Sequence, residues 1–151
     1  MGEPRTRTRT LLILLVVGIS TPLALGVETL LRMLIFPPEF DEVRMWLRPM
    51  ITPYVWAAPV LAAVATVVGI WLQRSLARRA IDKLEPHERT PENLAAAHFD
   101  GLMLSTSAPQ IPALLGTVAF MMGAALAPVL VGIAVATVGV LVVGLATMKS
   151  E

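Results

Sequence analysis

The sequence contains no cysteine and few charged residues, and each shortage excludes a class of protein. Without cysteine, the chain has no disulfides, no thiolate metal sites and no cysteine nucleophile. Charged residues make up 15% of its 151 residues, against about 25% in soluble domains. The net charge of +1 gives no support for nucleic-acid binding. The remainder is strongly apolar, with 56% hydrophobic residues and a mean hydropathy of +0.72.

Motifs for catalysis and for cofactor binding are also missing. The sequence has no P-loop, no GxGxxG after a strand and no GxSxG nucleophile elbow. Its two histidines, His87 and His98, do not have the spacing of zinc ligands. Ser105 and Ser107 lack a histidine base at a usable spacing. We therefore expect no enzyme activity, no cofactor and no metal ion.

The apolar residues gather in blocks that are long enough to cross a bilayer. The first block, Leu11 to Val27, gives roughly 25 Å of helix. We expect it to continue to the pair Pro37–Pro38, because proline interrupts a helix. The second block opens with Thr52 as the expected N-cap and Pro53 as the first helical residue.

The longest apolar run extends from Ile111 to Met148 without a charged residue. As one helix it would be roughly 57 Å long, which is too much for a single crossing. We expect a hairpin that turns at Gly123–Pro128; the alternative is one long broken helix. The sequence therefore predicts an all-α integral membrane protein with four transmembrane helices in two hairpins. This single membrane domain, residues 1–151, has expected spans at about 11–35, 53–74, 102–123 and 128–148.

Basic residues set the expected orientation through the positive-inside rule. They precede the first block and follow the second and the fourth: Arg5, Arg7, Arg9, Arg74, Arg78, Arg79, Lys83 and Lys149. Both termini and a connector at about 75–101 are therefore predicted to be cytoplasmic, in the inner membrane of a bacterium. The connector should hold a helix that begins with Thr90 as N-cap and Pro91 as first residue.

The first 26 residues also fit a cleaved signal peptide, with a basic start, an apolar core and a possible cleavage site at Ala24–Gly26. The apolar run resumes at Leu30, which favours a retained first span. Cleavage would leave three spans without inverting the rest of the chain.

The external connection between the first two spans predicts a short interfacial helix. Phe40, Val43 and Leu47 fall on one side at helical spacing, and Trp46 can lie among lipid headgroups. We expect a connector in the interface; the alternative is a docking surface for a partner.

Two ionisable residues lie close to the outer end of the first span. Glu28 and Arg32 are four residues apart with the acid first, which is the better orientation for an ion pair on a helix. Their position near the end of the hydrocarbon favours an interfacial ion pair; the alternative is an ion relay or a substrate site. No acidic residue lies within Thr52–Leu72 or Ile111–Met148, which weakens a proton-coupled mechanism but leaves a passive pore open.

The third predicted span carries a polar line of three residues, Thr106, Gln110 and Thr117. Hydroxyl groups can bond to carbonyls of their own helix, but the Gln110 amide needs another partner. We expect a bond to a neighbouring helix; the alternative is a polar path.

The fourth predicted span carries small residues at four- and seven-residue spacings, which let helix backbones approach closely. These residues are Ala125, Gly132, Ala136, Gly139, Gly144 and Ala146, with Ala124 before them. The face serves either packing inside the chain or contact with a second protein.

These observations predict a small multi-pass membrane protein without catalytic machinery. We expect a packing or accessory subunit that acts through helix–helix association. Its partners would be the lipid bilayer together with a second copy or a membrane complex. The alternative is a small transporter or channel whose path lies on the third helix.

Overall fold

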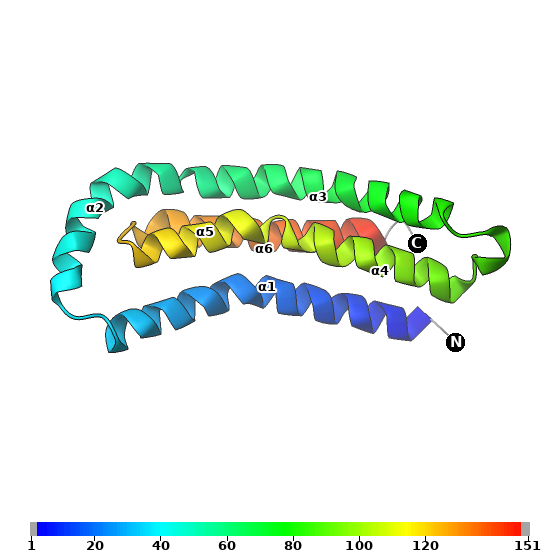
Figure 1. Ribbon diagram of the computed structural model, residues 1–151, viewed down its shortest axis with the longest axis horizontal. Coiled ribbons are helices and arrows are strands. Elements are labelled where there is room, and N and C mark those ends of the chain that lie inside the picture. The colour runs from blue at the N-terminus through cyan, green and yellow to red at the C-terminus, as the bar shows by residue number, and fades with distance from the viewer. Residues whose placement is uncertain (1–2, 149–151) are drawn as a thin grey trace.

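The computed structural model describes residues 3–148, and this part of the chain is helical almost throughout, without a strand. It contains six α-helices and one short 3-10 helix (Figure 1). Their bounds are α1 Glu3–Leu34, α2 Glu39–Val55, α3 Ala57–Asp82, η1 Pro86–Glu88, α4 Pro91–Ser107, α5 Gln110–Met121 and α6 Leu126–Met148. The all-α class predicted from the sequence is therefore confirmed.

The long helices lie lengthwise in one bundle, and α2 curves around one end of it (Figure 1). Helices α1, α4 and α5 run in one direction, whereas α3 and α6 run in the other. Helix α3 packs most extensively on α6 and α4, and α1 packs on α5 and α6. The start of α1, the end of α6 and the connection between α3 and α4 lie toward the same end of the bundle.

Three helices are long and apolar enough to cross a membrane: α1, the continuous helix formed by α2 and α3, and α6. The third predicted span is divided at Ala108–Pro109 into α4 and α5. Pro109 and Pro112 lack the backbone donors that a continuous helix would use there. Helix α5, with 12 residues, is only about 18 Å long. The four-span topology stays a prediction.

The helix start that was predicted at Thr52 and Pro53 is wrong. Helix α2 continues through Pro49 and Pro53, and only Trp56 separates it from α3, so the predicted interfacial helix and the helix of the second span form one segment that curves around the end of the bundle (Figure 1). Thr52 does cap a backbone donor, but a distant one, because its hydroxyl oxygen accepts a hydrogen bond of 3.0 Å from the backbone N–H of Ala125.

Two predicted helix boundaries agree with the structure. The Thr90 hydroxyl caps α4 by accepting from the backbone N–H of Asn93 at 3.3 Å, and Pro91 is the first residue of that helix. The turn between α5 and α6 covers 122–125 and overlaps the predicted segment Gly123–Pro128. Gly123 permits this turn because its φ is +113°, and a Cβ there would lie 2.7 Å from the carbonyl oxygen of Arg44.

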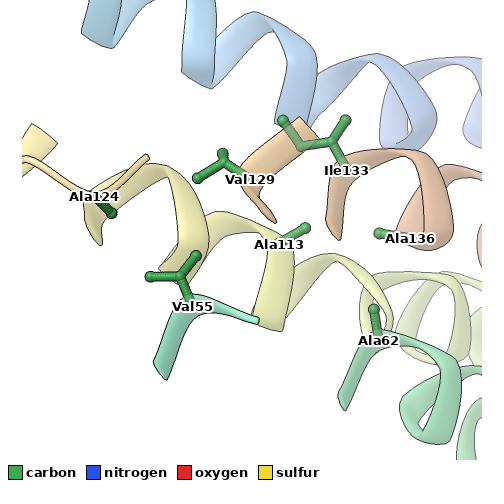
Figure 2. Packing of buried hydrophobic residues seen from close by; sticks show 7 residues of the cluster. All are labelled: Val55, Ala62, Ala113, Ala124, Val129, Ile133 and Ala136. Carbon is green, nitrogen blue, oxygen red and sulfur yellow. The ribbon is translucent and has the colours of Figure 1, made fainter. Parts of the chain in front are cut away.

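Alanine and valine predominate in the interior of the bundle, whereas many large apolar side chains lie on its outside. Figure 2 shows the buried cluster, which consists of Val55, Ala62, Ala113, Ala124, Val129, Ile133 and Ala136. Leu15, Val67 and Leu115 are among the many large apolar residues that remain more than half exposed. Soluble proteins rarely expose so large an apolar surface. This surface and the three long apolar helices are those of a membrane protein.

Candidate polar site between α1 and α5

Two side-chain hydrogen bonds join α1 to α5, two helical turns apart. The Thr21 hydroxyl donates to Oε1 of Gln110. The Thr117 hydroxyl is shared between Oε1 of Glu28, at 3.0 Å, and the carbonyl of Leu114 in its own helix, at 2.8 Å. Both pairs are separated by 89 positions in the sequence, as expected for neighbouring helices that run in the same direction. We call these four residues the polar row.

The polar row is deeply placed in the bundle. Thr21, Gln110 and Thr117 are at most 3% exposed, and Glu28 is half-buried. If the hydrocarbon begins near Leu11, Thr21 lies about 15 Å along α1 and Glu28 about 26 Å, within a layer of about 30 Å. On that assumption, the first bond would lie near the middle of the hydrocarbon layer and the second near the boundary farther from the start of α1.

Two atoms of the polar row lack a hydrogen-bond partner among the residues that the structure describes. They are the amide nitrogen Nε2 of Gln110 and the carboxylate oxygen Oε2 of Glu28, and both are buried. A buried polar atom without a partner costs about 1–3 kcal/mol. The α1–α5 interface therefore holds an amide NH₂ group and a carboxylate oxygen that are free to bond a water molecule, a cation or a polar solute.

Thr106, the third residue of the predicted polar line, does not join the row. Its buried hydroxyl donates to backbone carbonyls of its own helix, at 2.8 Å to Leu102 and 3.2 Å to Met103. Ser105 and Ser107 bond back to α4 in the same way. Thr21 takes part instead, and no sequence signal pointed to it, because a lone threonine in an apolar helix normally bonds to its own backbone.

The predicted ion pair between Glu28 and Arg32 is wrong. Arg32 bonds Asp41 at 3.3 Å and lies 5.4 Å from the centre of the Phe120 ring. The chain folds back after α1 and brings the first turn of α2 beside Arg32, while α5 supplies Thr117 to Glu28. The partners of Arg32 and Glu28 are both set by tertiary contacts, which the spacing of residues along one helix cannot reveal.

A second polar cluster, centred on Arg44, was not predicted. The Arg44 side chain is buried, and it donates to the backbone carbonyl of Met121 and to Asp41, both at 3.0 Å. Its guanidinium also lies 4.9 Å from the centre of the Phe36 ring. The one available sign in the sequence was the spacing of three residues between Asp41 and Arg44 on a predicted helix.

The small residues of α6 pack inside the chain. A Cβ on Gly132 would meet Ala58 of α3 at 3.6 Å, and one on Gly139 would meet Pro109 at 3.2 Å. A Cβ on Gly144 would meet the Leu14 side chain of α1. The remaining predicted positions are buried at Ala136 and half-buried at Ala125 and Ala146. Of the two uses expected for this face, the structure shows internal packing.

Within the part of the chain that the structure describes, no group of three or more histidine, aspartate or glutamate side chains is arranged to hold a metal ion. Comparison of the chain with protein-family models, with curated proteins and with solved structures gives no match.

Proposed function

We propose that this chain is a four-span protein of the bacterial cytoplasmic membrane, with both termini in the cytoplasm and without catalytic machinery. The third crossing in chain order would be α4 and α5 together, which follow the length of the bundle in Figure 1. The basic residues Arg74, Arg78, Arg79 and Lys83 lie toward the end of α3 that connects to α4. This distribution supports a cytoplasmic position for that end.

We further propose that the polar row binds a small polar solute or a cation, so that the chain acts as a small transporter or channel. The observation that carries this proposal is the pair of buried, unpartnered atoms, Nε2 of Gln110 and Oε2 of Glu28, on one helix interface. Polar groups inside a membrane are costly, and a site that leaves two of them free is best explained by a ligand that pairs with them.

Nε2 of Gln110 and Oε2 of Glu28 would make different contacts with a ligand. The Gln110 amide would donate a hydrogen bond to an acceptor on the solute near the middle of the bilayer. The Glu28 oxygen would receive a donor or a cation nearer the outer boundary. An open hollow of about 480 Å³ reaches Thr29, the neighbour of Glu28, and supports entry from the α2 end of the bundle.

Flux measurements on the purified chain in liposomes test this function. Proton and K⁺ fluxes would be followed with internal dyes, and glycerol entry with light scattering. We expect one of these fluxes to exceed that of protein-free liposomes and to fall at least about tenfold in Gln110→Leu and Glu28→Gln. Gln73→Leu, which removes a buried amide of α3, is the matched control and should leave the flux unchanged. Absence of flux for all three probes, or equal loss in the control, would contradict the proposal.

A second candidate function is that of an accessory subunit that associates through α1. In its apolar window only 17% of the residues are buried, against 44% for α6, so α1 offers most surface to a partner. A Cβ added at Gly18 or Gly26 would meet no atom of another described helix within 4 Å, and Pro22 between them is exposed. Gly18 and Gly26 are eight residues apart and so lie on one side of α1, where small residues permit close approach of another helix.

Crosslinking distinguishes this candidate, because the native chain has no cysteine. Ile19→Cys places a thiol on the exposed side of α1, and Val67→Cys places one on the exposed side of α3. Association through α1 predicts oxidative dimers from the first variant but not from the second, or a protein that co-purifies and is released by Gly26→Leu. A monomer without such a protein would rule it out.

A further inference from the structure

Three arginines surround an open hollow at the end of the bundle where α2 lies. This hollow, of about 370 Å³, is lined by Arg32, Arg44 and Arg48 together with the carboxylate of Asp41. The neighbouring hollow that reaches Thr29 shares Arg32 and Asp41 with it. Cationic side chains rarely converge without an anion, because their mutual repulsion opposes folding.

The single carboxylate does not balance these charges. Oδ1 of Asp41 accepts from both Arg44, at 3.0 Å, and Arg32, at 3.3 Å. Arg48 has neither an ion-pair nor a hydrogen-bond partner within the described part of the chain. Three guanidinium groups and one carboxylate leave a local charge of about +2 around the hollow, counting each ionised side chain as one unit.

Two of the three arginines are held in place by contacts that do not depend on an anion. Arg44 is 5% exposed and is fixed by the carbonyl of Met121 and the Phe36 ring. Arg32 lies over the Phe120 ring. A guanidinium whose position is already fixed loses little conformational entropy when it binds a ligand, so the hollow is preorganised for an anion.

The hollow lies at the expected level of the lipid headgroups. Arg32 is about 30 Å along α1 from Leu11, which is the thickness of the hydrocarbon layer. On α2, Trp46 and Tyr54 are 64% and 80% exposed, as expected for aromatic residues at the membrane–water boundary. A ligand here would carry its charge at the surface rather than inside the membrane.

We infer that this arginine hollow binds a phosphate-bearing anion. Planar guanidinium groups bond two oxygens of a phosphate at once, and the surplus charge favours a phosphate monoanion or dianion. The phosphate can belong to an anionic phospholipid of the outer leaflet or to a free phosphate. The site is distinct from the polar row, and its test does not depend on flux.

Binding to the full-length protein in a neutral detergent tests the inference. Native mass spectrometry would count phosphatidylglycerol bound from an equimolar mixture with phosphatidylcholine, and titration with inorganic phosphate would test for displacement. Arg48→Gln is the decisive variant, because Arg48 has no structural partner to lose. We expect about fivefold weaker binding of the anion, as one arginine near a membrane surface contributes about 1 kcal/mol. Arg48→Lys keeps the charge but loses the planar guanidinium, so it should recover only part of the binding.

Arg78→Gln is the matched control for loss of one charge, because Arg78 is exposed and lies near the end of α3 that is distant from α2. Retention of phosphatidylglycerol that phosphate does not displace would identify the lipid as the ligand, and displacement by phosphate would identify the free ion; both support the site. Equal retention of the two lipids with no effect of phosphate, or equal loss in Arg48→Gln and Arg78→Gln, would overturn it.

Discussion

The hydroxyl of Thr21 donates a hydrogen bond to the side-chain carbonyl of Gln110 across the interface between α1 and α5. The two residues lie 89 positions apart, and both are almost completely buried. This bond joins α1, whose apolar window is the least buried of the three long apolar helices, to the rest of the bundle. The other polar atom of the same amide, Nε2 of Gln110, is buried without a hydrogen-bond partner among the described residues.

Thr21→Val should destabilise the protein because it keeps the shape of the side chain but leaves Oε1 of Gln110 without its donor. We expect the free energy of unfolding, measured by SDS titration in mixed micelles, to fall by about 1 kcal/mol. Adding Gln110→Leu should restore most of this loss, since no buried carbonyl then lacks a partner. Thr66→Val, whose hydroxyl bonds only to the Ala62 carbonyl of its own helix, is the control. An equal loss in that control would contradict a specific interhelical bond.

Gly123→Ala should be costly because the turn between α5 and α6 leaves no room for a side chain. The φ of +113° strains any residue with a Cβ, and the added atom would lie 2.7 Å from the carbonyl oxygen of Arg44. We expect a loss of about 2 kcal/mol or more in the free energy of unfolding. Gly116→Ala should be neutral or slightly stabilising, because its Cβ would meet Ala58 at 3.8 Å and alanine favours a helix. Similar stability of the two variants would show that the turn can relax.

Asp41→Asn should lower the thermal midpoint of the purified protein, because Arg44 would stay buried without its carboxylate partner. Glu42→Gln is the matched control: Glu42 is also exposed in the first turn of α2 but has no ion pair in the described structure. The difference between the two variants should shrink at high salt, since the Asp41 side chain is 57% exposed. Equal midpoints at low salt would mean that Asp41 does not help to anchor Arg44.

Single cysteines should report the proposed topology without interference from native thiols. In intact spheroplasts, we expect an impermeant maleimide to label Glu42→Cys and Leu126→Cys, whereas Glu85→Cys should react only after lysis. Labelling at 42 but not at 126 would mean that α4 and α5 do not cross the membrane. Labelling of all three positions in intact spheroplasts would contradict the proposed orientation.

Local sequence signals identified the features that depend on a few neighbouring residues. Thr90 and Pro91 marked the start of α4, and the breakers around Gly123 marked the final turn. Thr52 and Pro53 carried the same signal as Thr90 and Pro91 but proved misleading. There, α2 accommodates its prolines and the Thr52 hydroxyl caps Ala125 of the distant turn. A capping motif indicates which hydrogen bonds a residue can form, and the tertiary structure determines which partner lies within reach.

The amino-acid sequence by itself determined the class of this protein. Its long apolar blocks exclude a soluble globular protein. These blocks must be helical because backbone groups in lipid have to form hydrogen bonds within their own segment. Only the tertiary structure decided the partners of its polar side chains. Helical spacing brought Glu28 near Arg32, yet the parallel packing of α1 and α5 joined Glu28 to Thr117, and the fold of α2 gave Arg32 to Asp41. Pairs between distant residues depend on how whole helices pack. The sequence of one helix does not determine how that helix is aligned with its neighbour.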